Sequence, residues 1–392
     1  MTDAELNRTP VLPDGAAPEG GRIEAPKRTI LQESWSLFRK NRLAMGGMVI
    51  FVVFFMVAVI GVFLTTGRSP YLNPAQVRLQ EKLLPPLSKP NLQNLQTAEV
   101  PRLGLYLLGT DELGRDVFSR MLQGSWVSLT VGFVAVGIAI FIGVFLGGMA
   151  GFYGKYRIRT GHLLALVLLG GGIYALGAGR IVLGVSLAVP GAALVGLLTW
   201  RVNRRGSIGL PFLFSKLFSV DILIVGLVDI MLCFPSFFLI LTVVALLPPS
   251  IYNIMAVIGL TSWMGATRFV RAEFLSLRER DFVTAARALA ISDWRIIFRH
   301  MVPNAMAPVF VSATIGIATA ILTEAGLSFL GFGVPPPHAT WGNILSDGKD
   351  YIFDAPWLTF VPGFAILVVV LAFNLFGEGL RDALNPRLRE HR

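Results

Sequence analysis

The most highly charged segment of the sequence runs from Arg268 to Asn304, and its residue types and spacing suit contact with another protein. It contains seven arginines and four acidic residues in a chain that is otherwise poor in charge. Within it, the stretch from Asp281 to Ala290 has helical periodicity. The residues at positions i, i+3, i+4 and i+7 are Phe282, Ala285, Ala286 and Leu289. A face made mainly of alanine inserts weakly into lipid but lets another backbone approach closely. The pattern predicts a short helix that docks into a groove on a protein partner, although a helix lying on a membrane surface has the same periodicity.

The chain carries none of the local motifs that bring nucleotide, metal or acyl chemistry to a protein. It lacks a G-x-x-x-x-G-K-[ST] phosphate loop, an H-E-x-x-H zinc motif and a G-x-S-x-G nucleophile turn. Cys233 is its single cysteine, so there is no disulfide framework and no thiolate metal site. We therefore expect no enzymatic activity, no cofactor and no bound metal.

The composition predicts that membrane-spanning helices position these residues. Hydrophobic residues make up 54% of the chain and charged residues 15%, against about 25% charged residues in soluble domains. The apolar runs are continuous and do not alternate, which favours helices over a β-barrel. The formal charge of +10 is typical of basic cytoplasmic loops, so we expect membrane lipid as a partner and no nucleic acid.

Eight apolar runs are interpreted as spans because each has about the length needed to cross a bilayer. They cover residues 45–66, 122–154, 163–178, 181–200, 230–247, 251–269, 305–330 and 358–376. Basic residues flank the runs on alternate sides, which predicts a multi-pass plasma (inner) membrane protein with both termini in the cytoplasm. The expected organisation is a disordered cytoplasmic tail (1–26), an N-terminal region with the first span (27–66), an external cap (67–121), a transmembrane domain (122–380) and a cytoplasmic tail (381–392). The transmembrane domain would include an inserted hairpin at 156–219 and a cytoplasmic loop at 270–304.

Transport by a chain without a nucleotide site leaves two energy sources, ions within the membrane or a partner that hydrolyses ATP. Asp229 and Glu324 are the ionisable candidates for ion coupling. Both are expected near helix ends, where hydrogen-bonded or interfacial carboxylates are the more common interpretation. The charged loop is therefore the stronger lead.

The loop around Ala285 resembles the cytoplasmic loop of ABC importer permeases, in which a short coupling helix docks on the ATPase subunit. That family's pattern is E-A-A, three residues, G, nine residues and I-x-L-P. Three residues match it at the right spacing, namely Ala285, Ala286 and Pro303. Four residues depart from it, namely Thr284 for glutamate, Ala290 for glycine, His300 for isoleucine and Val302 for leucine. These departures resemble the oligopeptide/dipeptide branch of the family.

Three further segments are similar to the same branch and occur in the same order, at 108–120, 324–343 and 377–387. The residues of this resemblance whose role stays open are Asp111, Gly114, Arg115, Asp116, Asp229, Glu324 and Trp341. Arg115 and Asp116 are interpreted as a structural pair at the outer face, with a dock for a binding protein as the alternative.

The resemblance implies an all-α polytopic membrane protein with the type I ABC importer permease fold, a six-span core plus the inserted hairpin. It implies two ATPase subunits, a second homologous permease and an extracytoplasmic solute-binding protein as partners, with ATP hydrolysed by the ATPase subunits. The implied coupling residues are Asp281, Phe282, Thr284, Ala285, Ala286, Arg287, Leu289, Ala290 and Pro303. The implied cargo is a dipeptide or oligopeptide, with nickel, glutathione or an oligosaccharide as alternatives within the branch. An ion-coupled secondary carrier and a membrane scaffold are the alternatives outside it.

Overall fold

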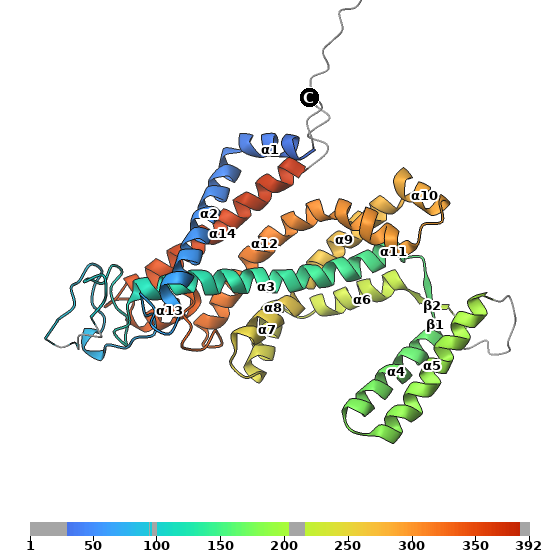
Figure 1. The fold of residues 1–392 in the computed structure, drawn as a ribbon, viewed down its shortest axis with the longest axis horizontal. Coiled ribbons are helices and arrows are strands. Elements are labelled where there is room, and N and C mark those ends of the chain that lie inside the picture. Colours follow the sequence, from blue (N-terminus) through green and yellow to red (C-terminus); the bar gives the residue numbers. More distant parts are fainter. Residues whose placement is uncertain (1–29, 94, 96–99, 204–215, 385–392) are drawn as a thin grey trace, which may run out of the picture.

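The computed structural model describes residues 30–93, 95, 100–203 and 216–384, and helices dominate it (Figure 1). The predicted tail at 1–26 lies outside the described residues, and of the tail at 381–392 only 381–384 are described, as the end of the last helix. The elements in chain order are α1 (Ile30–Lys40), α2 (Arg42–Thr65), the 3₁₀ turn η1 (Leu79–Glu81), α3 (Val117–Phe152), β1 (Arg157–Arg159), α4 (Thr160–Gly177), α5 (Ile181–Asn203), β2 (Lys216–Ser219), α6 (Val220–Leu232), α7 (Ser236–Leu246), α8 (Ile251–Thr261), α9 (Trp263–Arg278), α10 (Asp281–Ala288), α11 (Asp293–Arg295), the π-helical turn η3 (Ile296–Met301), α12 (Val302–Phe329), α13 (Trp341–Gly348), the 3₁₀ turn η4 (Lys349–Tyr351) and α14 (Trp357–Leu384). Residues 67–116, between α2 and α3, are called the cap.

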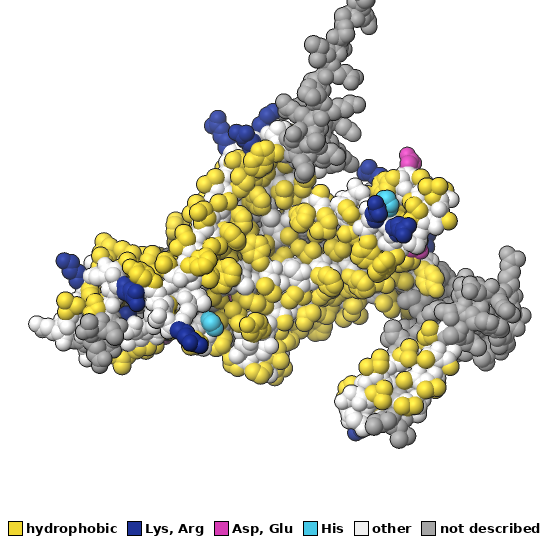
Figure 2. Space-filling model, viewed as in Figure 1, with side chains coloured by type: hydrophobic (Ala, Val, Ile, Leu, Met, Phe, Trp, Pro, Cys, Tyr) yellow, Lys and Arg dark blue, Asp and Glu magenta, His cyan; other side chains and the backbone are white. Residues whose placement is uncertain are grey.

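Four helical segments are long and apolar enough to cross a membrane, namely α2, α3, α14 and the segment Asp293–Phe329 that contains α12. They coincide with four of the predicted runs. The 24 residues of α2 extend about 36 Å at 1.5 Å per residue, which exceeds the roughly 30 Å of hydrocarbon in a bilayer. Hydrophobic side chains cover much of the visible face of these helices, while Lys and Arg gather near α1, near α10 and on the cap (Figure 2). The chain is therefore a multi-pass α-helical membrane protein.

The predicted span over 230–247 is not one straight helix, because the chain bends by 80° between α6 and α7. Taken together, the two helices are long and apolar enough for a broken span or a re-entrant loop. Pro235 lies at this bend. It has no N–H with which to continue α6, and its ring disfavours helical backbone at the preceding Phe234. The predicted span over 251–269 is likewise divided at Ser262, between α8 and α9. The total of eight spans stays a prediction.

The hairpin that the sequence predicts around Arg180 is present as α4 and α5. The two helices pack closely, because a Cβ added at Gly191 of α5 would lie 3.0 Å from the backbone nitrogen of Leu169 on α4. An antiparallel ribbon of β1 and β2 joins the hairpin to the rest of the chain, and Figure 1 shows the hairpin projecting away from the other helices. Its side chains Ile173 and Tyr174 are 68% and 80% exposed. Whether the hairpin crosses a membrane stays a prediction.

A stripe of glycines lets α3 and α9 pack at backbone distance. Gly143, Gly147 and Gly151 recur every fourth residue along α3. A Cβ added at Gly147 would lie 2.6 Å from the carbonyl oxygen of Thr267, and one at Gly151 would collide with Phe274. Contacts between small residues are a main way in which helices associate in lipid. They hold α9 firmly against α3, and α9 leads directly into α10.

The largest buried cluster lies where α3, α8, α12 and α14 meet. Leu129, Ile258, Ile321 and Val369 are each 2% exposed or less within it. Because these four helices share one core, they form a common frame that carries the cap at one end and α10 at the other (Figure 1).

Candidate functional site

Two buried side chains, spaced three residues apart, attach α10 to the rest of the protein. Val283 and Ala286 are 0% and 5% exposed, and residues i and i+3 lie on one face of a helix. They belong to a buried cluster that includes Phe274 of α9 and Met301 ahead of α12. One face of α10 is therefore packed onto the end of α9 and the approach to α12.

The exposed face of α10 differs from the predicted docking face. The prediction groups Phe282, Ala285, Ala286 and Leu289, but in the structure Ala286 faces inward. Phe282 and Leu289 are 38% and 75% exposed, and Ala285 is exposed too. The helix is rotated because the β-branched Val283 fills the interior beside Ala286. A partner can therefore reach the surface formed by Phe282, Ala285 and Leu289, which we call the outer face of α10.

α10 ends with a backbone arrangement that explains why the related pattern has glycine at the position of Ala290. The N–H of Ile291 donates to the carbonyl of Ala286 at 3.1 Å, and the N–H of Ala290 donates to that of Arg287 at 3.0 Å. These two bonds form a Schellman motif, which needs a left-handed residue after the helix. Ala290 supplies it with φ of 52°. Glycine, which the related pattern has at this position, adopts that conformation without a Cβ penalty.

Replacing Ala290 with glycine is expected to stabilise the protein. A left-handed backbone costs an L-residue roughly 1–2 kcal/mol more than it costs glycine, and the greater entropy of glycine in the unfolded chain offsets part of this gain. We expect Ala290→Gly to raise the free energy of unfolding by about 1 kcal/mol, measured by thermal unfolding of the purified protein in detergent. Ala290→Val should have the opposite sign, and a lower unfolding temperature for the glycine variant would contradict the assignment.

The other predicted coupling residues surround α10. Asp281 lies in its first turn, where a carboxylate is favourable at the positive end of the helix dipole. The Thr284 hydroxyl donates to a backbone carbonyl one turn earlier, at 3.1 Å. The Arg287 guanidinium lies 5.1 Å from the centre of the Phe152 ring at the end of α3, within cation–π distance. Pro303 lies in the first turn of α12, directly after the π-helical turn η3.

Two ion pairs join α6 to α9. Arg271 pairs with both carboxylate oxygens of Asp221, and its Nη2 lies 2.7 Å from Oδ2. Arg268 donates from Nη2 to Oδ1 of Asp229 at 2.6 Å, and both of these side chains are about half exposed. Asp229 is therefore paired with an arginine close to the end of α6. Its position at a membrane interface stays a prediction.

In the cap, Asp111 is the centre of a buried ion network. Its side chain is 0% exposed and accepts hydrogen bonds from the backbone N–H groups of Leu113 and Arg115, at 3.0 and 2.8 Å. It also accepts from Nε of Arg115 at 2.7 Å and from Nη1 of Arg120 at 2.5 Å. Both arginines reach Asp347 of α13, at 3.1 and 2.8 Å. The network therefore ties the cap to α3 and α13.

Three carboxylates of this network come close enough together to resemble a cation site. Oxygens of Asp111, Glu112 and Asp347 lie within 4.8 Å of one another. However, the guanidiniums of Arg115 and Arg120 already lie among these oxygens and neutralise much of their charge. Burial and the neighbouring carboxylates raise the pKa of Glu112, which further weakens it as a metal ligand. The arrangement suits ion pairing within the protein.

Arg115 and Asp116 do not form the predicted pair. Asp116 instead caps the N-terminus of α3, accepting from the backbone N–H groups of Phe118 at 3.3 Å and Ser119 at 3.1 Å. Because the Asp116 carboxylate satisfies these N–H groups, α3 begins at Val117, five residues before the predicted run. Gly114 has φ of 71°, and a Cβ there would collide with a backbone carbonyl of the cap, so glycine is required. The motif residues in this region therefore build the junction between the cap and α3.

Replacing Tyr106 with phenylalanine is expected to remove a loss of stability at alkaline pH. Burial raises the pKa of Tyr106 to about 12, and its hydroxyl has no hydrogen-bond partner among the described residues. The unfolded chain ionises near pH 10, so native stability falls between pH 10 and 12 by up to about 1.4 kcal/mol per pH unit. The stability of Tyr106→Phe should fall less with rising pH over this range, and at pH 7 the variant should be no less stable than the original protein. Identical pH profiles for the two proteins would contradict this account.

Glu324 and Trp341 join α12 to α3 and α13 in the interior. The Glu324 carboxylate is 0% exposed and accepts from the hydroxyls of Ser328 at 2.7 Å and Ser128 at 3.4 Å. Trp341 is 1% exposed, and its Nε1 donates to the carbonyl of Met121 at 3.3 Å. Hydroxyl groups hold this carboxylate five residues before the end of α12, which fits a structural role.

Two adjoining hollows follow one side of α12 and share Ser312 and Ile315; together they are called the α12 groove. The hollow beside α10 has a volume of about 770 Å³ and is lined by Phe282 of α10 and Arg381 of α14. The hollow between α3, α8 and α12 measures about 270 Å³. The second hollow is lined mainly by small and hydroxyl-bearing residues, among them Ser262, Gly265, Gly316, Thr319 and Thr323. The groove therefore offers a weakly polar surface beside helices whose visible face is largely apolar (Figure 2).

Two segments of the chain match described protein families. Residues 207–390 match the "Binding-protein-dependent transport system inner membrane component". Residues 29–86 match the "N-terminal TM domain of oligopeptide transport permease C". The first match contains α6 to α14, with α10 and the α12 groove, and the second contains α2 and the first part of the cap.

Curated relatives are similar to this chain over nearly its whole length. The dipeptide transport system permease protein of Alkalihalophilus pseudofirmus is 34% identical, with 91% of this chain and 90% of the relative covered. The di/tripeptide transport system permease protein of Pseudomonas aeruginosa is 33% identical, with 92% and 93% covered. The oligopeptide transport system permease protein of Bacillus subtilis is 28% identical, with 95% of each chain covered.

Proposed function

This chain belongs to the family of binding-protein-dependent transport system inner membrane components, and from that premise we propose that it is the permease subunit of an ATP-driven peptide importer. Peptides are the cargo named for all three relatives described above, which favours them over nickel, glutathione or oligosaccharides. ATP is hydrolysed by separate ATPase subunits, since this chain carries no phosphate-binding loop.

The observation that carries this proposal is the geometry of α10. It is a short helix with one side held by Val283 and Ala286, and its outer face, Phe282, Ala285 and Leu289, is bare at one end of the molecule. A helix laid into a groove is a common mode of recognition between proteins. In this proposal the outer face of α10 lies in a cleft of an ATPase subunit.

A movement of α10 can pass into the membrane because α9 and α3 move with it. α10 follows α9 directly. At the glycine stripe beginning at Gly143, α3 and α9 are in backbone contact, so the two helices move as one body. Arg271 and Asp221 add α6 to the same unit. When ATP binding closes the two ATPases, α10 moves and these helices tilt together, which alternates access to the path.

A second, homologous permease completes the translocation path. The α12 groove, with Ser312, Thr319 and Thr323 along it, forms this chain's share of the path. In this arrangement a six-span core of the type I importer fold is joined by the hairpin of α4 and α5, giving eight spans. The cap is external, where a solute-binding protein docks on it, and α10 and both termini are cytoplasmic.

Reconstitution of the whole transporter tests the proposal. The chain is placed in liposomes with the second permease, the two ATPase subunits and the binding protein encoded near it, and uptake of a radiolabelled dipeptide is measured. Uptake should require ATP and all of the subunits. Uptake by this chain alone, abolished by a protonophore, would contradict the proposal in favour of an ion-coupled carrier. Binding of ATPases without any uptake would instead indicate a membrane scaffold.

A further inference from the structure

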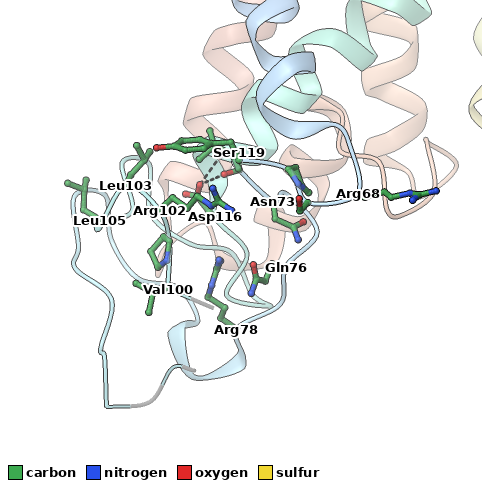
Figure 3. Close-up of a pocket in the computed structure, with 15 residues that line it drawn as sticks. Arg68, Asn73, Gln76, Arg78, Val100, Arg102, Leu103, Leu105, Asp116 and Ser119 are labelled. Atoms are coloured by element: carbon green, nitrogen blue, oxygen red, sulfur yellow. Dashed lines mark hydrogen bonds between the residues drawn. The ribbon is translucent and has the colours of Figure 1, made fainter. Parts of the chain in front are cut away.

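The cap contains a pocket of its own, distant from α10 and from the α12 groove. It has a volume of about 360 Å³ and lies between the segment that follows α2, the segment around residue 102 and the start of α3. Figure 3 shows Arg78, Arg102 and Asp116 converging on it from these three segments. The volume lies at the lower end of the range for small-ligand sites.

The lining of this pocket is positively charged. It includes three arginines, Arg68, Arg78 and Arg102, and a single acid, Asp116, so its formal charge is +3 − 1 = +2. The Asp116 carboxylate is already committed, because it accepts from two backbone N–H groups and from the hydroxyl of Ser119 at the start of α3.

The guanidinium of Arg102 is placed where a ligand can reach it. It lies 5.2 Å from the centre of the Tyr71 ring, and Arg102 is exposed. Contact with an aromatic face orients the planar fork but leaves its N–H groups free to bond in the plane. A guanidinium in this state matches the two oxygens of a carboxylate.

The remaining lining suits an organic ligand better than an inorganic anion. Leu103 and Leu105 provide apolar surface, and the side-chain amide nitrogen of Asn73 can donate to a peptide carbonyl. We propose that this pocket binds the free carboxylate end of a short peptide before the peptide enters the translocation path. The inference rests on the proposed peptide cargo and adds a site in the permease itself. A concave site of this size admits two or three amino acids, whereas a folded protein partner needs a broader contact area.

Calorimetric titration of the full chain in lipid nanodiscs tests the inference, with leucyl-leucine and leucyl-leucinamide as probes. The dipeptide should bind, and amidation should weaken its binding at least about tenfold because a charged hydrogen-bond partner is lost. Arg102→Gln should cause a similar loss for leucyl-leucine and none for the amide. Arg102→Lys, which keeps the charge but loses the fork, should fall between Arg102→Gln and the original protein. Lys89→Gln removes a positive charge from the cap outside the pocket and should leave the affinity unchanged.

Three outcomes would overturn the site. These are no binding of leucyl-leucine, equal binding of its amide, and an Arg102→Gln variant whose only defect is weaker association with the binding protein. The proposed function is judged separately, by uptake in the reconstituted transporter. ATP-driven uptake without binding in nanodiscs would refute the site and keep the importer. Carboxylate-dependent binding without uptake in the complete transporter would refute the peptide importer and keep a carboxylate site.

Discussion

Replacing Ala285 with arginine is expected to lower ATP-driven peptide uptake at least about thirtyfold while the protein remains folded. Ala285 is exposed on the outer face of α10, so arginine there meets solvent in the free chain. In the proposed complex the same side chain would be buried unpaired in a close helix contact, which costs about 2–5 kcal/mol. Uptake and ATP hydrolysis in proteoliposomes measure the effect, and the hydrolysis should no longer respond to the binding protein.

The control for this substitution is Ala178→Arg, which adds the same side chain at an exposed alanine between α4 and α5. It should leave uptake unchanged. Ala286→Arg is unsuitable, because Ala286 is 5% exposed and an arginine there would disrupt the packing of α10 itself. Normal uptake by the Ala285→Arg transporter would show that the outer face of α10 is not where the ATPase binds.

Replacing Asp111 with alanine is expected to destabilise the protein by about 3–5 kcal/mol, the usual cost of removing one partner from a buried ion network. The change removes four hydrogen bonds and leaves Arg120, which is 3% exposed, with Asp347 as its remaining partner. We expect the thermal unfolding midpoint to fall by roughly 10 °C and the cap to become sensitive to protease.

Asp350→Ala is the matched control, since Asp350 is exposed close to α13 and should tolerate the change with little loss. The double variant Asp111→Ala, Arg120→Met should lose less stability than the two single changes added together, because it leaves one fewer buried charge unpaired. Additive losses would mean that Asp111 and Arg120 do not act as a pair.

Several features of the site can be predicted from the sequence. The charged loop with its helical spacing predicts α10 at nearly its observed position, and the apolar runs predict α2, α3, α12 and α14. The repeat of Gly143, Gly147 and Gly151 is also visible in the sequence, and spacing of this kind signals close helix packing in lipid. It is the signal by which the α3–α9 contact could have been predicted.

Other features depended on contacts between distant segments. Helical periodicity allows either Phe282 or Val283 to face the interior. Val283 is the buried one, because residues of α9 and of the turn before α12 pack against it. Arg115 and Arg120 both reach Asp347, more than 200 residues further along the chain, and this contact ties the cap to α13. The sequence near these arginines gives no information on that distant partner.

The sequence by itself determined that the protein lies in a membrane, the class of its fold and the place of α10, because hydropathy, loop charge and helical periodicity are properties of local stretches of chain. The tertiary structure alone decided which side of α10 is free, how the cap is held to α3 and α13, and that three separate segments of the cap enclose one positively charged pocket. These properties depend on which buried groups find partners, and the partners come from segments that only folding brings together.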